Sequence, residues 1–435
     1  FSVTVRMGQK FSCKGCGSCG TCGDSGDTAN SKGQVMSEEI KHDKAKEEEI
    51  AERKKEEDAY AEAEAWKAEA QTKSVEEQLL YDQLEQLYNF KILLLGAGES
   101  GKSTILKQLK NIHNHKIPKS DLNHITMSLH QNIVECMRAL LGALGTYEQE
   151  IKDERHLETV KIVQNFGEDS MLTQDEAIAI QALWKSEPIK NVYEHRADYW
   201  ILDSCDYYME HAARFAEEDF EPNEEDCLRA RIRTTGIVVS ELKSKYAREE
   251  GEPMALTVKV VDVGGQRNER KKWMHCFDDV KCILFLSSLA GYHQVLFEDQ
   301  KRNRMHEALE LFKKIAHDKT FKDTPIFLLL NKKDLFEQMI REAPLTSCFE
   351  EYKGDNSYKA AFAHIENEFR KQLPTGKAVE IFDVTGVSRR DVKEVFQQVK
   401  ARLLEIHRPK MSKERDEILR KLKAFDSRWR KCVCM

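Results

Sequence analysis

One stretch of this 435-residue chain, residues 91–104, constrains the fold more than any other. The apolar run Ile92–Leu95 is typical of a buried parallel strand, Gly96–Ser103 fits the pattern G-x-x-x-x-G-K-[ST], and residues 105–110 continue as a helix. In this context the glycines let backbone N–H groups turn toward an anion, and Lys102 adds a charge within reach of phosphate oxygens. The alternative is a glycine-rich turn that only caps a helix. The complete motif with both flanks favours a site for a nucleoside phosphate.

A second set of residues can hold a divalent cation and assist hydrolysis. The Ser103 hydroxyl can complete a Mg²⁺ shell. Asp262 ends the apolar strand 256–263 and can hold the same ion from the other side, as a Walker-B acid does. Gly265 leaves room for a backbone N–H beside the γ-phosphate, and Gln266 can orient an attacking water.

A third motif indicates which base is bound. Asn331–Asp334 reads N-K-K-D and follows the buried run Ile326–Leu330. A carboxylate at Asp334 can accept both the ring N–H and the amino group of guanine, a pattern that adenine cannot offer. The Lys332 stem can lie over the base. N-K-x-D alone is a common tetrapeptide, but behind a buried strand and after the other two motifs it favours guanine.

Composition limits the classes of protein that fit. The net charge of −7 argues against a general nucleic-acid-binding protein. The sequence has no apolar run of about 18 residues and no apolar signal-peptide region, so we expect a cytosolic protein without a membrane span. Of the 12 cysteines, four lie within residues 13–22 and two at 432–434, which leaves six scattered singly. We therefore expect reduced thiols and no disulfide framework.

The N-terminal region carries candidate lipidation sites. Residues 1–35 are predicted to be a flexible tail, in which Met7–Ser12 fits the myristoylation pattern with Gly8 as the acceptor if Met7 is the true start. The cysteines at every third position from Cys13 to Cys22 are open to two interpretations, a metal site or palmitoylation. The run lacks the longer last gap and following proline of Fe–S motifs, and it has no second half of a zinc finger. Palmitoylation, beginning at Cys13, is favoured.

The C-terminal region, residues 407–435, is charged, with apolar residues such as Ile418 and Leu422 at helical spacing. It ends in Cys432-Val-Cys-Met435, which fits C-a-a-X with methionine at the last position. Prenylation of Cys432 and docking of an unmodified tail into a receptor remain open alternatives.

Periodicity divides the chain into regions. The expected boundaries are the tail at 1–35, a long N-terminal helix at 36–89, a sheet domain at 90–111 and 224–406, an all-helical domain at 112–223, and the C-terminal tail at 407–435. Further strands are predicted at 235–239, 256–263, 282–287 and 326–330, with a hairpin tip at 241–253. Helices are predicted at 125–144, 173–185, 196–215, 300–316, 358–372 and 392–406. The alternation of strands and helices implies a doubly wound, mostly parallel sheet.

With these motifs in place, the chain resembles the α subunits of heterotrimeric G proteins. The similarity covers about residues 85–405 and is carried by residues 96–104, 228–236, 262–273, 303–307 and 330–336. It implies an α/β fold of the P-loop GTPase (Ras-like) class, with a doubly wound, mostly parallel sheet, an inserted all-α helical domain and a long N-terminal helix.

The resemblance also implies roles for individual residues. Arg231 would be a built-in arginine finger, paired with Glu99, and would act in hydrolysis together with Gln266. An arginine just before a Thr-Thr-Gly segment can neutralise charge that develops on a transferring phosphoryl group. Spacing alone does not choose Arg231, because Arg229 and Arg233 alternate with it and all three could form a solvated strand face.

The residues implied to bind nucleotide form a longer set. Ser103 and Thr234 would hold Mg²⁺, and Asp203-Ser204 would close over the nucleotide from the helical domain. The full set is Glu99, Ser100, Gly101, Lys102, Ser103, Thr104, Asp203, Ser204, Leu228, Arg229, Ala230, Arg231, Thr234, Asp262, Gly265, Gln266, Asn331, Lys332, Asp334 and Val384.

The sequence departs from the family at the loop that caps guanine. The family has Thr-Cys-Ala-Thr there, and near residue 382 this chain reads Phe382–Thr385. Val384 would still donate its backbone N–H to the guanine carbonyl, because that contact needs no side chain. Asp383 would add a negative charge beside the base, so we expect altered nucleotide affinity and fast exchange. The hairpin between 235 and 262 and both terminal helices are also longer than in the family.

The sequence therefore predicts a membrane-anchored switch that binds GTP, hydrolyses it to GDP with Mg²⁺, and signals at the cytoplasmic face of the plasma membrane. The expected partners are a βγ dimer, a G protein-coupled receptor, an effector and a GTPase-activating protein, with no nucleic acid. One alternative is a guanine nucleotide-locked scaffold with little turnover. A P-loop kinase acting on a small metabolite is a further alternative, but no acceptor base or substrate lid supports it.

Overall fold

The computed structural model describes residues 75–113, 117–246 and 254–433, together with isolated positions between 54 and 65. The chain divides into two compact units, Phe1–Gln78 and Leu79–Met435. All the elements named below belong to the second unit, where residues 79–86 are helical and precede the first strand. Within the described part of the chain, no helix is both long enough and apolar enough to cross a membrane.

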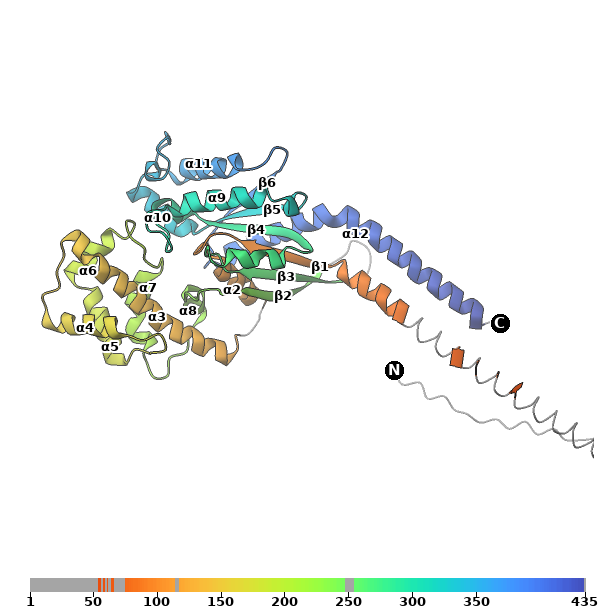
Figure 1. Ribbon diagram of the computed structural model, residues 1–435, viewed down its shortest axis with the longest axis horizontal. Helices are drawn as coiled ribbons and strands as arrows, with labels where there is room; N and C mark the ends of the chain where they lie inside the picture. The colour runs from red at the N-terminus through yellow and green to blue at the C-terminus, as the bar shows by residue number, and fades with distance from the viewer. Residues whose placement is uncertain are drawn as a thin grey trace, which may run out of the picture. The chain divides into compact units, whose positions relative to one another are not determined.

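A six-stranded sheet lies at the centre of the second unit, in the order β2-β3-β1-β4-β5-β6 (Figure 1). Only β2 is antiparallel to its neighbour. The order changes direction at β1, and in such sheets ligands bind beyond the carboxyl ends of the strands at that point. The strands are β1 (Asn89–Leu95), β2 (Ile237–Tyr246), β3 (Met254–Val263), β4 (Val280–Ser288), β5 (Ile326–Asn331) and β6 (Val379–Val384).

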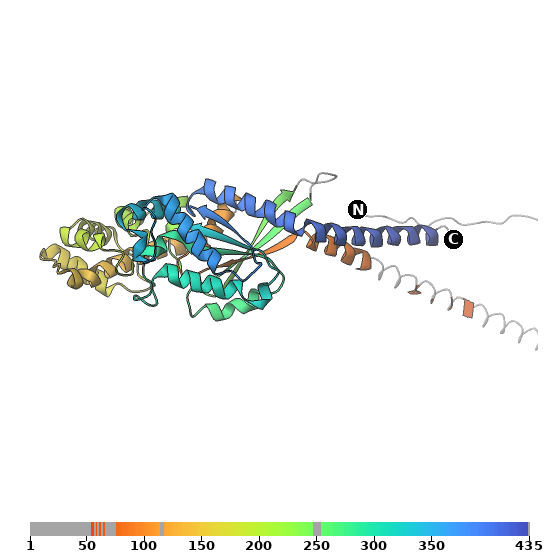
Figure 2. The same ribbon diagram turned by 90° about the horizontal axis from the view of Figure 1, so that it is seen from above.

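Helices cover both faces of the sheet, with α12 and α9 on opposite sides (Figure 2). Side chains alternate along a strand, so Leu93 and Leu95 of β1 join the core on one face, while Ile92 and Leu94 join the core on the other. The first core is covered by α9 (Arg304–Ala316), α10 (Lys333–Glu342) and α11 (Tyr358–Lys371). The second is covered by α2 (Lys102–Ile112) and α12 (Arg389–Val433).

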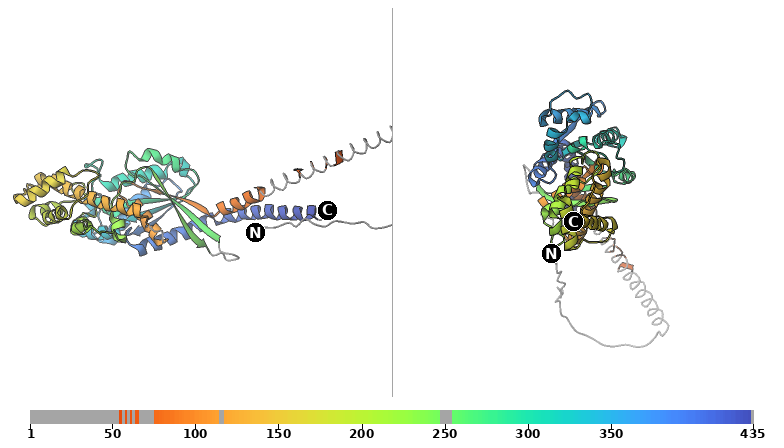
Figure 3. Two further views of the ribbon diagram at one scale, coloured as in Figure 1. Left: turned by 90° about the horizontal axis from the view of Figure 1, so that it is seen from below. Right: turned by 90° about the vertical axis from the view of Figure 1, so that its left-hand side faces the viewer.

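A separate group of helices lies beside the sheet and has its own core (Figures 1 and 3). Its longest helix is α3, which buries Ile125, Leu129, Ile133 and Met137 at a spacing of four residues. The helices are α3 (Lys119–Ala143), α4 (Glu154–Asn165), α5 (Gln174–Trp184), α6 (Glu187–Glu194) and α7 (Cys205–Phe215), and α8 (Glu224–Arg229) leads back toward the sheet. Short 3₁₀ helices lie at Leu144–Tyr147, Arg270–Cys276, Leu289–His293, Lys319–Phe321 and Leu345–Ser347.

The predicted α/β fold and mostly parallel sheet are confirmed, and several element boundaries are corrected. The helix predicted at 196–215 begins only at Cys205. The helix predicted at 392–406 is 45 residues long and continues through Pro409. His407 Nε2 lies 3.1 Å from the Lys281 carbonyl, and Met411 packs against the core, so tertiary contacts outweigh the donor that proline lacks.

Several sequence predictions fall on residues that the structure does not describe. They are the tail at 1–35 with Gly8 and Cys13, most of the helix at 36–89, residues 247–253 of the hairpin tip predicted at 241–253, and the side chain of Cys432. The lipidation sites therefore stay predictions. Residues 241–246 of that predicted tip belong to β2, because the hairpin pairing with β3 continues to Tyr246.

Candidate functional site

The loop after β1 has a backbone that only glycine can supply at two positions. Gly101 precedes α2 with φ of 95°, and a Cβ there would lie 2.1 Å from Asn331 Nδ2. A Cβ at Gly96 would lie 2.2 Å from the Leu286 carbonyl oxygen. Both glycines let the loop turn tightly against its neighbours, so that the N-terminus of α2 faces the space beyond the strand ends.

Lys102 lies under this loop with its charge poorly solvated. Its side chain is buried, and Nζ donates to the carbonyls of Gly96 at 3.1 Å and Ala97 at 2.9 Å. Burial lowers the pKa of Lys102 to about 8, although the nearby Asp262 carboxylate acts in the opposite direction. A Cβ at Gly265 would lie only 2.7 Å from the backbone carbonyl oxygen of Ala97, so glycine is required there. A buried ammonium at the N-terminus of a helix suits an anionic ligand.

Proton uptake on nucleotide binding tests this environment. A phosphate beside Lys102 restores its usual high pKa, so binding should take up a proton wherever the free protein has lost it, that is, above about pH 8. Calorimetric titration of nucleotide-free protein with GDP, in buffers of different ionisation enthalpy, should show little uptake at pH 7 and more than half a proton at pH 9. Affinity should fall with rising pH over the same range.

The control for this measurement is Lys107→Met. Lys107 also has a pKa lowered to about 8 by burial, but its ammonium is bonded to the carbonyls of Cys227 and Ala230. On binding GDP at pH 9, the Lys107→Met variant should take up as many protons as the unmodified protein does. Equal proton uptake at pH 7 and pH 9 in the unmodified protein would contradict the assignment of Lys102 to the phosphates.

Two hydroxyls and a carboxylate converge next to Lys102. Ser103 Oγ lies 2.7 Å from Thr234 Oγ1 and donates to Asp262 Oδ2 at 2.6 Å. Asp262 Oδ1 is buried and has no hydrogen-bond partner among the described residues. Burial raises the pKa of Asp262, with Lys102 opposing the shift. Oxygen donors of this kind, one of them unsatisfied, fit a hard cation such as Mg²⁺.

Arg231 lies at the same cavity with its guanidinium paired to Glu99, as predicted. Arg231 NH2 lies 2.7 Å from Glu99 Oε1, and the other Glu99 oxygen lies 2.5 Å from Arg304 NH2. Arg231 NH1 is buried and has no hydrogen-bond partner within the described part of the chain. A partly buried cation with a spare donor suits a ligand that carries or develops negative charge.

Asn331 connects the loop that follows β1 to the loop that follows β6. It is buried at the end of β5, where its Nδ2 donates to the Ser100 carbonyl at 2.9 Å. Its Oδ1 accepts from the backbone N–H of Gly386, also at 2.9 Å. One side chain thus fixes the position of the two loops relative to each other.

The end of the cavity beside α10 carries Lys332 and Asp334. Lys332 has φ of 63°, and its Nζ lies 2.5 Å from Asp203 Oδ2. Burial alone would raise the pKa of Asp203, but Lys332 and Arg304 outweigh it and hold that pKa well below its usual range. Asp334, in the first turn of α10, lines the cavity and can accept hydrogen bonds from a base.

The structure does not bring Val384 to the cavity. Val384 is fully buried in the core beneath α12 and pairs with Asn331 in the sheet. The described residues that line the cavity at this point are Gly386 and Val387. Thr385-Gly-Val-Ser388 can be matched to the family's Thr-Cys-Ala-Thr with Thr385 as its first threonine, a signal that the sequence analysis missed.

Asp383 is likewise absent from the described cavity lining. Its carboxylate accepts from Tyr358 Oη at 2.8 Å and lies 2.7 Å from Lys333 Nζ. Burial would raise the pKa of Asp383, but these two partners lower it. The expected free negative charge beside the base is therefore not present, and the reason for expecting fast exchange is removed.

These groups surround one cavity of about 220 Å³. Of the predicted residues, Ser100, Asp262 and Val384 do not line it, although the first two contact residues that do. Those that line it are Glu99, Gly101, Lys102, Ser103, Thr104, Asp203, Ser204, Leu228, Arg229, Ala230, Arg231, Thr234, Gly265, Gln266, Asn331, Lys332 and Asp334. Lining residues that the prediction missed are Gly98, Lys107, Leu202, Tyr208, Ile232, Arg233, Leu335, Gly386 and Val387.

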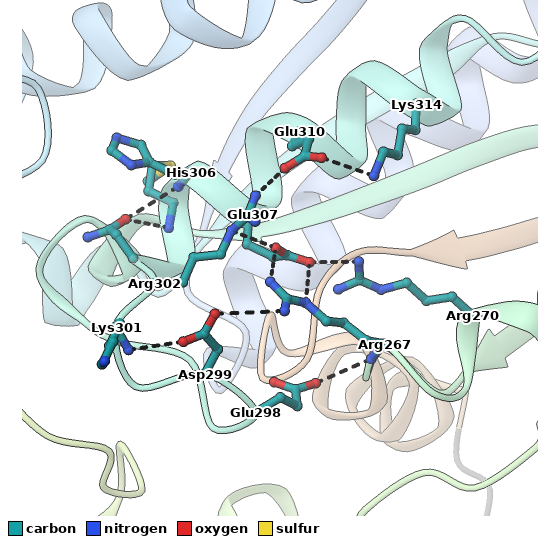
Figure 4. Close-up of polar contacts among 12 residues, drawn as sticks. Arg267, Arg270, Glu298, Asp299, Lys301, Arg302, His306, Glu307, Glu310 and Lys314 are labelled. Carbon is teal, nitrogen blue, oxygen red and sulfur yellow. Dashed lines mark hydrogen bonds and ion pairs between the residues drawn. The ribbon is translucent and has the colours of Figure 1, made fainter.

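The segment after Gln266 is tied to α9 through Glu307 (Figure 4). The Glu307 carboxylate lies 2.7 Å from Arg267 NH2, 2.7 Å from Arg270 NH1 and 2.9 Å from Arg302 Nε. Burial would raise the pKa of Glu307, but hydrogen bonds from Arg267 and Arg270 outweigh it and lower that pKa to about 2. Arg270 also donates to the Gly265 carbonyl, so this network reaches the edge of the cavity.

Replacing Glu307 with glutamine should destabilise the protein. Three arginines would lose their shared anion, and since they are partly exposed we expect a loss of about 2 kcal/mol, below the usual value for a fully buried pair. In a domain of this size that corresponds to a fall in melting temperature of roughly 4–8 °C. The matched control is Glu310→Gln, one turn later on α9 and more exposed, for which about 0.5 kcal/mol or less is expected. Equal melting temperatures for the two variants would refute the role of Glu307 as the anion that stabilises the three arginines.

Comparisons with known proteins point to one family. The family model for the G-protein alpha subunit matches residues 69–403. The chain is 44% identical to the guanine nucleotide-binding protein alpha-8 subunit of Dictyostelium discoideum over 325 residues, covering 74% of this chain and 78% of that protein. It is 40% identical to a guanine nucleotide-binding protein subunit alpha of Pyricularia oryzae, covering 69% and 83%, and 36% identical to the G(o) subunit alpha of Locusta migratoria, covering 76% and 92%.

Proposed function

This chain belongs to the family of G protein alpha subunits and acts as a GTP-binding switch, and we propose that it hydrolyses GTP to GDP with Mg²⁺. The observation that carries the proposal is the convergence on one cavity of a buried lysine, paired hydroxyls, a partly buried arginine and the Asp334 carboxylate. Hydrolysis needs the first three groups, and recognition of guanine needs the last.

Residues of the P-loop and β3 hold the phosphates and the metal. Lys102 and the N-terminus of α2 bind the β- and γ-phosphate oxygens, because their positive charge is otherwise poorly solvated. Ser103 and Thr234 hold Mg²⁺ through their hydroxyls, and Asp262 supports the shell from behind Ser103. Mg²⁺, when bound, neutralises charge that develops on the phosphate oxygens. The unsatisfied Asp262 Oδ1 supports this assignment.

Gln266 and Arg231 act in the chemical step. Gln266 lines the cavity beside Gly265 and orients the attacking water. Arg231 turns its NH1 group, which has no partner within the described residues, to the transferring phosphoryl group and stabilises the transition state. Loss of the γ-phosphate then releases the segments around Thr234 and 265–273, which changes the affinity for partners.

Guanine is bound at the end of the cavity beside α10. Asp334 accepts from the ring N–H and the amino group, and the Lys332 stem covers one face of the base. Val387, rather than Val384, donates its backbone N–H to the guanine carbonyl, which Gly386 and the bond to Asn331 support. Asp203 and Ser204 close the cavity from the helical side. Glu99, Ser100, Gly101, Thr104, Leu228, Arg229 and Ala230 complete the binding site.

In the cell, the protein passes a signal from a G protein-coupled receptor to an effector. It pairs with a βγ dimer and responds to a GTPase-activating protein, and lipids at Gly8, Cys13 and Cys432 anchor it to the cytoplasmic face of the plasma membrane. Membership of the family supports the partners and the plasma-membrane location, and the lipid sites rest on the sequence motifs alone.

Residues 112–223 form the helical domain, and residues 90–111 with 224–406 form the GTPase domain.

Competition between nucleotides tests the proposed function against a P-loop kinase. Purified protein is loaded with a fluorescent, slowly hydrolysed GTP analogue in the presence of Mg²⁺, and GTP or ATP is added in excess. Unlabelled GTP should displace the probe and ATP should not. Equal displacement by ATP would overturn the guanine assignment.

A further inference from the structure

The backbone that carries Arg231 is held by side chains of several helices. Arg229 is the last residue of α8, and residues 230 and 231, which follow it, lie outside regular secondary structure. Tyr208 of α7 donates its hydroxyl hydrogen to the Arg229 carbonyl at 2.5 Å. Lys107 of α2 donates to the Ala230 carbonyl at 3.0 Å. These bonds satisfy carbonyls that no helix or sheet partner would otherwise satisfy.

Asn132 of α3 bonds both backbone polar groups of Arg231 itself. Its Oδ1 accepts from the Arg231 N–H at 2.8 Å, and its Nδ2 donates to the Arg231 carbonyl at 3.1 Å. The side chain is buried, and it comes from a helix 99 residues earlier in the chain. A carboxamide offers an acceptor and a donor side by side, so it fixes the peptide groups on both sides of the Arg231 Cα.

Trp200, from the same helical region, holds the other end of Arg231. Its indole N–H donates to Glu99 Oε1 at 3.0 Å, the oxygen that pairs with the guanidinium. The Trp200 ring centroid lies 5.1 Å from Arg231 Cζ, and Phe297 packs edge-on against that ring at 4.7 Å. The guanidinium therefore lies beside both a carboxylate and an aromatic face, which limits its rotamers.

We propose that Asn132 is a positioning residue for GTP hydrolysis, which fixes the Arg231 backbone while Trp200 orients its guanidinium. This inference rests on the proposed function of Arg231. The region of α3–α7 thereby sets the geometry of hydrolysis as well as closing over the nucleotide. Neither residue touches the reacting atoms, and both act through Arg231. Catalytic groups displaced by about 1 Å can lose roughly 100-fold in rate, so fixing an otherwise irregular segment has a large effect.

The test compares one-round GTP hydrolysis by Asn132→Ala in the unmodified protein and in Arg231→Ala. In the unmodified background the variant should slow hydrolysis roughly 10- to 100-fold with nucleotide uptake little changed. In the Arg231→Ala background it should cause no further slowing, because its effect passes through that arginine. The matched control is Gln131→Ala, at the preceding residue of α3. The Gln131 amide donates to the Gly167 carbonyl, and its removal should leave hydrolysis unchanged.

A second variant covers the case in which Asn132→Ala fails to fold. Trp200→Phe keeps the aromatic packing and removes only the N–H bonded to Glu99, and it should show the same dependence on Arg231 with a smaller effect. Equal slowing with and without Arg231 would mean a merely structural role and would overturn the inference. Normal hydrolysis by both Asn132→Ala and Trp200→Phe would also overturn the inference. If Arg231→Ala itself left hydrolysis unchanged, the proposed function would fail instead, so the two failures are distinguishable.

Discussion

Replacing Arg231 with alanine should slow one-round GTP hydrolysis by about 10³-fold while GTP remains bound. An arginine that stabilises the transferring phosphoryl group supplies an effect of this order. Arg231 is suited to it because it lines the cavity, its guanidinium is oriented by Glu99, and its NH1 group has no hydrogen-bond partner among the described residues. The measurement loads the protein with radiolabelled GTP and follows release of phosphate after Mg²⁺ is added.

Arg233→Ala is the matched control for this prediction. Arg233 alternates with Arg231 in the sequence and also lines the cavity, but its guanidinium is more exposed and pairs with Glu135 of α3. A change of less than about threefold is expected, since exposed ion pairs contribute little. Similar slowing in both variants would restore the interpretation of these arginines as a general charged face and remove Arg231 from the chemistry.

Replacing Asp334 with asparagine should change which base is bound. The carboxylate accepts two hydrogen bonds from guanine, and an amide would set its own N–H group against one of those donors. A site that is built for hydrogen bonds rejects a mismatched partner strongly, so we expect GTP affinity to fall by about 10³-fold or more. Xanthosine triphosphate, which has a carbonyl in place of the guanine amino group, should bind the variant better than GTP does.

The control for the base prediction is Asp383→Asn. Asp383 lies on β6 and its carboxylate is occupied by Tyr358 and Lys333, so the variant should keep the preference for GTP. Competition binding with both nucleotides measures the two variants side by side. A switch to xanthosine triphosphate in the Asp383 variant, or none in the Asp334 variant, would contradict the assignment of the guanine contacts.

The sequence alone predicted the strand–loop–helix at 91–110 and the strand-end positions of Asp262 and Asn331. Each motif combines a short apolar run with a polar group whose place follows directly from the end of that run. The contact between Glu99 and Arg231, 132 positions apart, came from the family resemblance, since spacing could not choose among three alternating arginines.

Other features depend on tertiary contacts that no local pattern records. No local pattern marks the end of β6, so the sequence predicts the guanine contact at Val384. In the structure Val384 is a core residue, and Val387, three residues later, lies at the cavity. Asp383 is paired with Lys333 and Tyr358, and no local pattern in the sequence shows these contacts. The backbone bonds from Asn132 to Arg231 join distant segments and could not have been read from either one.

The most direct test of the switch is one-round hydrolysis of bound GTP by the unmodified protein and by Gln266→Leu. If Gln266 orients the attacking water, the unmodified protein should convert its bound GTP to GDP in a single exponential, and the variant should retain GTP for at least about 100 times as long. GTP that persists equally in both proteins would contradict the account and identify the chain as a guanine nucleotide-binding scaffold.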